Sequence, residues 1–298
     1  MAILYEELLT VSNEIKKMNY VVLVEAVHSN PNGDPDNDNA PRMDPDTEYG
    51  IISNQCLNRK IRNQVLLRMS GVDGYDIYIQ TDRTLNDKSA EAYNELGLDS
   101  KAAEKGSKLE NVVAAQKFML KKYFDIRTFG AVLSTGNFDA GRVTGAVQTS
   151  FARSVHPITV QEISLTRQAF TSNDRFEKNA SNEMGRKQIV PYGLYVFYVS
   201  ISAVQAAKNG FTAEDLKVYE TALINMFEND ESSCRNGMSV RGIYRFTHEH
   251  ELGNAPFWKL KELIHIDSKV DYPRQFNDFD IFVDEAAIPV GITMDKLV

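Results

Sequence analysis

The stretch IVPYGLYVFYVSISA, residues 189–203, carries the strongest strand signal in this chain of 298 residues. β-Branched and aromatic residues dominate it, and such residues fit the pleated surface of a sheet. The stretch YVVLVEAV, residues 20–27, has the same character and predicts a buried strand. We therefore expect a β-sheet that contains both segments.

Strand and helix patterns are mixed along the rest of the chain without strict alternation. Further strands are expected at residues 76–80, 125–133, 143–155, 158–170, 238–247 and 279–283. Helices are expected at residues 53–69, 89–105, 110–123 and 212–229, and the polar stretch 171–186 is expected to be a loop or hairpin tip. This mixture favours an α+β fold in which helices cover one face of an antiparallel sheet. The ferredoxin-like β-α-β-β-α-β arrangement is one such layout, and the absence of a linker predicts one elaborated domain.

Composition excludes several classes of protein. A hydrophobic fraction of 43% and a charged fraction of 25% are typical of a soluble globular protein. The N-terminal segment has no basic start followed by an apolar run, so we expect no secretory signal, and no stretch approaches the ~20 apolar residues that span a bilayer. Cys56 and Cys234 are far apart in the sequence, so neither a disulfide nor a zinc site is expected. We expect a cytoplasmic protein.

The stretch ISNQCLNRKIRNQVLLRM, residues 52–69, predicts a helix without any acidic residue. An apolar stripe recurs at spacings of three and four, and Ser53 or Asn54 is a suitable N-cap. Arg59, Lys60 and Arg62 lie off that stripe, so we expect their donors to face solvent or a ligand. Because the whole chain carries a formal charge of −8, this positive helix is a candidate cradle for a polyanion. The alternative is an ordinary solvated helix face.

A second acid-free stretch is GRVTGAVQTSFARSVH, residues 141–156, in which Arg142, Gln148 and Arg153 stand among small residues. Small residues let a polymer backbone approach closely. Further positive charge comes from Arg127, Arg175, Lys178, Arg186 and Lys187. Phe129, Phe138 and Phe151 either stack on bases or belong to the core. We expect the cations of both stretches to converge in one trough that follows a single sugar-phosphate strand.

Other motifs fail on inspection. The segment NPNGDPDND, residues 30–38, begins like a calcium loop, but the sixth position from Asp34 is Asn39 and the twelfth is Pro45. An Asx-rich turn is therefore the preferred interpretation. His248 and His250 are too few for a metal site, and no phosphate-binding loop or hydrolase motif is present.

Four longer motifs together resemble one known family. They are NPNGDPDNDNAPR at residues 30–42, CLNRKIRN at 56–63, RVTGAVQTSFARSVHPI at 142–158 and MGRKQIVPYGLY at 184–195. The region that they cover, from about residue 20 to residue 203, resembles the Cas-seven backbone subunit of type I-C CRISPR Cascade, the Csd type within the RAMP superfamily. The sequence departs from that family at Asn58, where a basic residue is expected.

The resemblance implies a fold and its parts. The fold is a modified RRM (ferredoxin-like) palm with an antiparallel sheet, helical insertions and a β-hairpin thumb, all within one domain at residues 1–298. The palm core is expected at about residues 19–80, 125–158 and 188–249, the helical insertion at about 86–124, and the thumb at about 155–192.

The resemblance also implies a function without catalysis, cofactor, metal or membrane. Copies of the chain form a head-to-tail helical filament along the CRISPR RNA and present the guide for pairing with target DNA in antiviral defence. Other implied partners are the Cascade large subunit, the end-cap subunit that processes precursor RNA and, indirectly, a recruited helicase-nuclease. The RNA-binding residues implied are Asn54, Arg59, Lys60, Arg62, Asn63, Arg127, Arg142, Gln148, Arg153, Arg186 and Lys187.

One alternative is an enzyme. Backbone subunits of type III complexes cut target RNA with an Asp in the loop before the basic helix. Asp34, Asp36, Asp38 or Asp44, all within the loop at residues 34–46, is in principle placed for that role.

Overall fold

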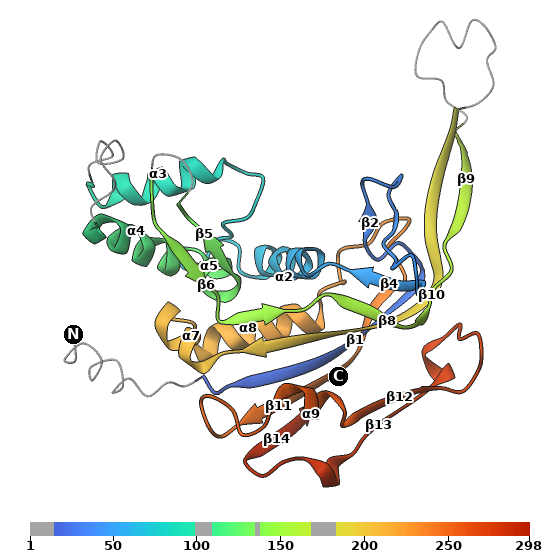
Figure 1. The fold of residues 1–298 in the computed structure, drawn as a ribbon. Helices are drawn as coiled ribbons and strands as arrows, with labels where there is room; N and C mark the ends of the chain where they lie inside the picture. The colour runs from blue at the N-terminus through green and yellow to red at the C-terminus, as the bar shows by residue number, and fades with distance from the viewer. Residues whose placement is uncertain (1–14, 99–108, 135–137, 168–182) are drawn as a thin grey trace, which may run out of the picture.

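A sheet of eight strands forms the centre of the computed structural model, which describes residues 15–98, 109–134, 138–167 and 183–298 (Figure 1). Neighbouring strands along its main path are antiparallel. That path runs through β14 (Ile292–Lys296), β11 (Met238–His248), β1 (Met18–Ser29), β10 (Glu183–Ile201), β8 (Ala152–Pro157) and β4 (Tyr49–Ile52). β7 (Val147–Thr149) and β9 (Gln161–Arg167) also pair with β10.

The two central strands, β1 and β10, are the two segments with the strongest strand signal. They pair antiparallel over their length, with Tyr20 opposite Val199 and Val24 opposite Tyr195. Val22 and Val24 point into one hydrophobic core, whereas Val21 and Leu23 point into another. Both faces of the strand are therefore buried, which explains why its sequence is apolar at nearly every position.

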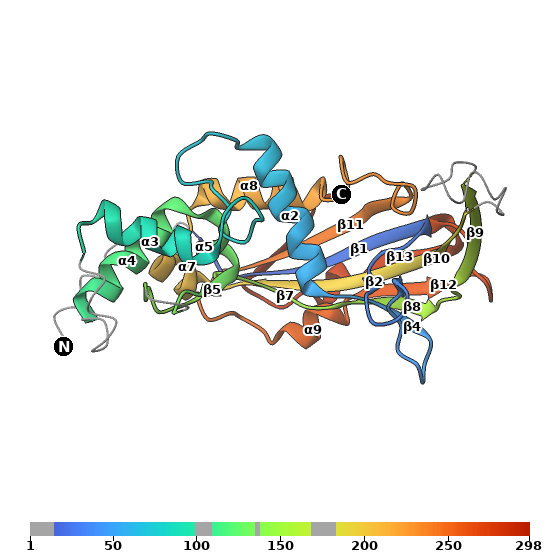
Figure 2. The ribbon, with the colours of Figure 1, turned by 90° about the horizontal axis from the view of Figure 1, so that it is seen from above.

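Two helices, α2 (Asn54–Arg68) and α8 (Ala213–Ile224), cover the first face (Figures 1 and 2). The second face packs against α9 (Phe257–Lys261), β12 (Ile264–Ser268) and β13 (Phe279–Val283). Helical cover of one face is thus confirmed, and C-terminal elements cover the other. Along the chain, the elements named here include β1, α2, β7 and β8, β10, α8 and β11, in that order.

A lateral lobe contains a third core and stands beside α2 (Figure 1). Its elements are α3 (Leu85–Glu95), α4 (Leu109–Lys122), β5 (Gly130–Val132) and β6 (Arg142–Thr144). α5 (Phe124–Phe129) joins this lobe to the sheet, and α7 (Ala203–Asn209) follows β10. The smaller elements are β2 (Gly33–Asp34), β3 (Ala40–Pro41), η2 (Phe276–Asp278) and η3 (Glu285–Ala287).

The predicted hairpin is formed by β9 and the start of β10, which project from the body of the protein (Figure 1). The ladder runs from Gln161 opposite Ile189 to Arg167 opposite Glu183. Most of the predicted tip, including Arg175 and Lys178, lies outside the described residues. Residues 183–186, which we expected in the tip, belong to β10.

Two predicted strands are wrong. Residues 76–80 form only an isolated bridge between Asp76 and Tyr123, and residues 125–133 form α5 and then the short β5. The side chain of Asp125 explains the first difference, because its carboxylate accepts hydrogen bonds from the amides of Tyr78, at 2.7 Å, and Ile79, at 3.1 Å, which therefore do not pair with a neighbouring strand. These contacts connect distant parts of the chain, so no local pattern predicts them. Among the described residues, no helix has the length and apolarity needed to cross a bilayer.

Candidate nucleic-acid interface

Helix α2 forms as its sequence predicts. The Ser53 hydroxyl caps it by accepting a hydrogen bond from the amide of Cys56 at 3.3 Å, and its first turn contains no acidic residue. Leu57, Ile61 and Val65 make the buried stripe. The helix therefore packs on the sheet through one apolar face.

Lys60 and Arg62 are buried, with exposed fractions of 7% and 8%. Lys60 pairs with Asp230, and Arg62 donates to Asp125 over 2.7 Å while its guanidinium lies 4.9 Å from the centre of the Phe129 ring. The expectation that these donors face solvent or a ligand is therefore wrong. The carboxylate partners of these cations lie 170 and 63 residues away in the sequence, so the lack of acidic residues within the helix does not leave the cations unpaired.

Arg127 is also an internal residue, with an exposed fraction of 6%. Its guanidinium forms two hydrogen bonds with Asp215, of 2.8 and 2.6 Å, and a third with the carbonyl of Gly74 at 2.7 Å. Asp215 also completes the capping box of α8 with Thr212, as the sequence predicts. Arg127 therefore holds α5 against α8 and does not offer a free charge at the surface.

The half-buried side chains of α2 include Asn54, Asn58, Arg59 and Asn63. Arg59 donates to the carbonyl of Ile79 at 2.6 Å, and burial lowers the pKa of its guanidinium. No carboxylate among the described residues lies within ion-pair distance of Arg59. Asn54 and Asn58 each have a buried Oδ1 that accepts no hydrogen bond from the described residues. Of the helix cations named at the outset, Arg59 is the one with access to a ligand.

The strands carry the exposed members of the predicted set. Arg142 on β6 and Gln148 on β7 are exposed, and Gln148 donates to the carbonyl of Gly145 at 3.1 Å. Arg153 on β8 is exposed, lies 4.7 Å from the centre of the Tyr49 ring and pairs with Asp44 at 3.6 Å. Solvent reaches these three side chains, so each of them is accessible to a phosphate or a base edge.

The three phenylalanines separate in the same way. Phe129 packs against Tyr219, and Phe138 packs against Tyr93. Phe151 has an exposed fraction of 59%, so it alone of the three is a surface residue.

Arg153 and α2 lie on opposite faces of the sheet. Ala152 belongs to the core beneath α2, whereas Phe151 and Arg153 line a groove with Val21 and Ile264 of the second core. The expected trough, with all these cations in one exposed row, is therefore wrong. Two of its members are buried, and a third is on the far face, because alternation along a strand separates neighbours.

Two further predicted residues lie at the base of the hairpin on β10. Arg186 is exposed and lies 3.5 Å from Glu162 of β9, and Lys187 donates to the hydroxyl of Ser233. Arg186 and Lys187 therefore place two cations on the described part of the hairpin.

The acidic loop before α2 is an Asx-rich turn, as the sequence predicts. The Asp34 carboxylate accepts from the amide of Asp36 at 3.3 Å, and that of Asp44 accepts from the amide of Asp46 at 3.1 Å. A hydrogen bond from the Thr47 side chain, and to a smaller extent one from the backbone of Asp46, lowers the pKa of the Asp44 carboxyl group. Among the described residues, no group of three His, Cys, Asp or Glu side chains is placed to hold a metal ion.

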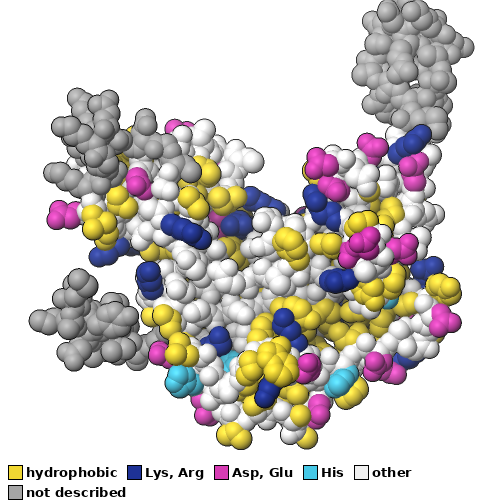
Figure 3. Space-filling view, in the orientation of Figure 1, with side chains coloured by type: hydrophobic (Ala, Val, Ile, Leu, Met, Phe, Trp, Pro, Cys, Tyr) yellow, Lys and Arg dark blue, Asp and Glu magenta, His cyan; other side chains and the backbone are white. Residues whose placement is uncertain are grey.

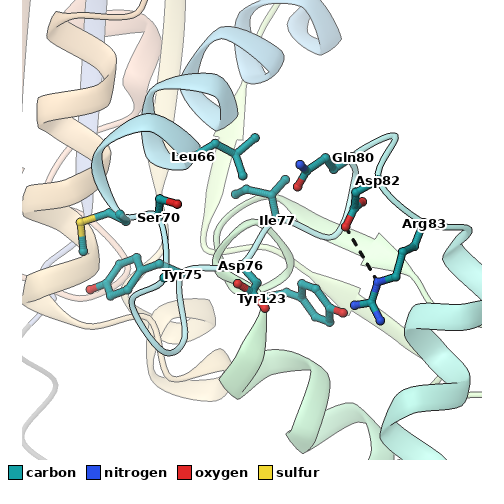
Figure 4. Close-up of a pocket in the computed structure, with 11 residues that line it drawn as sticks. Leu66, Ser70, Tyr75, Asp76, Ile77, Gln80, Asp82, Arg83 and Tyr123 are labelled. Atoms are coloured by element: carbon teal, nitrogen blue, oxygen red, sulfur yellow. Dashed lines mark ion pairs between the residues drawn. The ribbon is translucent and has the colours of Figure 1, made fainter.

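A pocket of about 140 Å³, which the sequence did not predict, lies at the end of α2 (Figure 4). Asp76, Gln80 and Tyr123 line it, together with Asp82 and Arg83, whose charged groups are 3.9 Å apart. Tyr123 is buried, and burial raises the pKa of its phenol. The pocket lies between the end of α2 and the lateral lobe, and no local motif predicts it because its walls come from three separate segments of the chain.

The fold and these side chains define an α+β protein with a projecting hairpin, with half-buried Asn and Arg side chains on one helix and with exposed Arg and Gln side chains on short strands. The chain belongs to the CRISPR-associated protein Cas7 family, whose family model matches residues 16–284. A CRISPR-associated protein Cas7 of Haloferax volcanii is 24% identical over 301 residues, which cover 95% of this chain and 85% of that protein.

Two solved structures are similar at lower levels. One, described as a CRISPR RNA-guided surveillance complex, pre-nicking, has a chain with 16% identity and a TM-score of 0.49, covering 80% of this chain and 79% of that one. A second, described as a CRISPR RNA-guided surveillance complex, has a chain with 17% identity and a TM-score of 0.42, covering 79% of this chain and 71% of that one.

Proposed function

We propose that this chain is the CRISPR RNA-binding backbone subunit of a type I-C Cascade. Copies of it assemble head to tail along the CRISPR RNA, and the filament presents the guide to a target DNA strand. The observation that carries the proposal is the match to the Cas7 family over residues 16–284. The four sequence motifs at residues 30–42, 56–63, 142–158 and 184–195 support the type I-C assignment.

The geometry supports a division of labour among the predicted RNA-binding residues. The side chains that solvent reaches contact the RNA. They are Asn54, Arg59, Asn63, Arg142, Gln148, Arg186 and Lys187, and the exposed Arg153 is not among them because it lies on the far face of the sheet. Lys60, Arg62 and Arg127 instead position these residues through buried ion pairs. Phosphate contacts of this kind fix the register of a nucleic acid without reading its sequence.

Backbone contacts suit a subunit that has to accept any guide. Base pairing between guide and target reads the sequence, and the same division holds for a different, single-protein effector. A guide that is already ordered by the protein loses less entropy when the target pairs with it. A head-to-tail contact joins two different patches, so it extends into an open helix unless end-capping subunits close it. We propose the Cascade large subunit and the RNA-processing end subunit as those partners.

The experiment that tests the proposal is purification of the chain from its own host. We expect a discrete small RNA to accompany it, in a particle whose mass corresponds to several copies of the 33.6 kDa chain. A monomer without RNA, or with random RNA fragments, contradicts the proposal.

We propose that the backbone subunit is a scaffold and not a ribonuclease. The loop aspartates support this, because Asp34 pairs with Arg42 at 3.2 Å and Asp44 accepts from its own turn. Incubation of the RNA-bound protein with complementary RNA is expected to leave that RNA intact. Regularly spaced cleavage that disappears in Asp34→Ala or Asp44→Ala variants would show the type III-like activity instead.

A further inference from the structure

An apolar groove of about 290 Å³ lies on the face of the sheet opposite α2. Its floor and walls include Phe151, Tyr198, Ile264 and Ile266. The face shown in Figure 3 has hydrophobic side chains gathered in a hollow there, with Lys or Arg side chains beside it. Such a hollow is larger than a packing defect, and exposed apolar surface of this kind marks a contact site.

The rim of this groove is positively charged. Arg153 and Lys261 line it, and no Asp or Glu does so among the described residues. The Lys261 ammonium lies 3.8 Å from the centre of the Tyr198 ring and 4.8 Å from that of Phe257, and it makes no ion pair with a described carboxylate. The complementary ligand is therefore an apolar side chain with a carboxylate beside it.

The loop after β11 has that chemistry. Leu252 has an exposed fraction of 68%, and the exposed Glu249 and Glu251 flank it. Neither glutamate forms an ion pair with another described residue. Val290, with an exposed fraction of 97%, lies on the adjacent segment, because the amide of Glu249 donates to the carbonyl of Gly291 at 2.9 Å. Leu252 thus stands at the centre of an acidic, apolar projection.

Internal hydrogen bonds hold this loop in shape. The amide of His250 donates to Asn254 Oδ1 at 2.9 Å, and the amide of Leu252 donates to His250 Nδ1 at 3.1 Å. Below them, the amide of Asn254 donates to the Nδ1 atom of the buried His248 at 2.9 Å. Because the loop is already ordered, little conformational entropy is lost when it binds.

We infer that the loop of residues 249–254 of one copy docks into this groove of the next copy. Leu252 enters between Phe151 and Ile266, and Glu251 faces Lys261. A nucleobase is a poorer occupant, because its polar edge would be buried against Val21, Val196 and Ile264 with few hydrogen-bond partners. The two patches differ, so the contact is heterologous and repeats along a chain of copies. The inference rests on the proposed assembly along RNA and names the surfaces that join the copies.

Disulfide trapping tests the contact directly. In a Cys56→Ser, Cys234→Ser background, a Leu252→Cys variant is mixed with an Ile266→Cys variant on a single-stranded RNA that holds several copies. Mild oxidation with glutathione disulfide then joins the two introduced thiols, with reduced glutathione as the other product. We expect a covalent dimer only from the mixture and only with the long RNA. No dimer, while the copies still assemble on the RNA, overturns the inference and leaves the proposed function standing.

Charge exchange provides a second test with the natural cysteines in place. Lys261→Glu or Glu251→Lys alone is expected to weaken cooperative assembly about tenfold, because like charges meet at the contact. The double variant restores it, and Lys217→Glu on the exposed face of α8 is the matched control with no effect. RNA binding by a single copy on a short RNA stays unchanged in every variant. The contact is contradicted if the double variant assembles as weakly as the single variants, or if the single variants assemble normally. The proposed function is contradicted if a single copy of the unmodified chain does not bind RNA.

Discussion

Helix α2 and the strands β7 and β8 carry similar side chains and use them differently. On α2, Lys60 and Arg62 are buried against Asp230 and Asp125. On β7 and β8, in contrast, Gln148 and Arg153 remain exposed. A segment without acidic residues is thus not always a positively charged surface, because carboxylates from distant parts of an acidic chain can pair with its cations. The difference separates residues that shape the interface from residues that touch the ligand.

The largest effect is expected from breaking a buried pair. Arg127→Ala leaves Asp215 charged and without its guanidinium, which costs about 3–5 kcal/mol in the free energy of unfolding. Urea denaturation measures it, and Arg142→Ala is the control, since an exposed residue without such a pair changes stability by less than about 0.5 kcal/mol. Equal stability of the two variants would erase the distinction between the two regions.

A smaller effect is expected where α5 approaches the strand region. A Cβ at Gly145 would lie 2.2 Å from the carbonyl carbon of Phe129 and 2.4 Å from the amide nitrogen of Gly130, so backbone has to move. Gly145→Ala is expected to lower the unfolding free energy by about 1–3 kcal/mol. Gly185→Ala on the hairpin is the matched control, because a Cβ there meets nothing within 4 Å. A tolerated Gly145→Ala means that the junction is looser than described.

Buried polar groups also predict a dependence on pH. His248 is fully buried and neutral, since its Nδ1 accepts from the amide of Asn254 while its Nε2 donates to Asn19 Oδ1 at 2.9 Å. Burial, and then the charge of Lys17, lower the pKa of this imidazole below its ordinary value of 6.5. The unfolded state therefore binds a proton first, and stability that is complete above pH 6.5 falls as the pH drops below it.

The expected slope is at most about 1.4 kcal/mol per pH unit for this single group. Denaturation midpoints between pH 7 and pH 5 measure it, and His248→Gln is expected to remove part of the slope whatever its effect on stability at pH 7. An unchanged slope in that variant shows that His248 binds protons equally in the folded and unfolded states, which contradicts the buried, neutral imidazole.

The sequence was sufficient to predict the framework. β1 and β10 follow from their apolar runs, and the caps at Ser53 and Thr212 follow from local side-chain chemistry. Period-two alternation also places Phe151 and Arg153 together on one face, away from Ala152. Which of those faces α2 covers depends on the crossover between strands, so the sequence alone did not place Arg153 relative to the helix.

The rest depended on pairs between distant residues. Asp125 on α5 accepts hydrogen bonds from Arg62, Tyr78 and Ile79, so the conformation of residues 76–80 depends on a residue far away in the sequence. The burial of Lys60, Arg62 and Arg127 follows from carboxylates that no local window contains. Charge patterns locate cations reliably, but exposure is a property of the whole fold.

The salt dependence of RNA binding tests the central distinction most directly. The slope of log K against log salt counts the phosphate contacts that a protein makes. Arg142→Ala is expected to reduce that slope by about 1, while Lys60→Met, measured where the variant is folded, leaves it unchanged. A slope that falls with Lys60→Met and stays constant with Arg142→Ala would contradict the assignment of exposed residues to RNA contact and of the buried helix cations to structure.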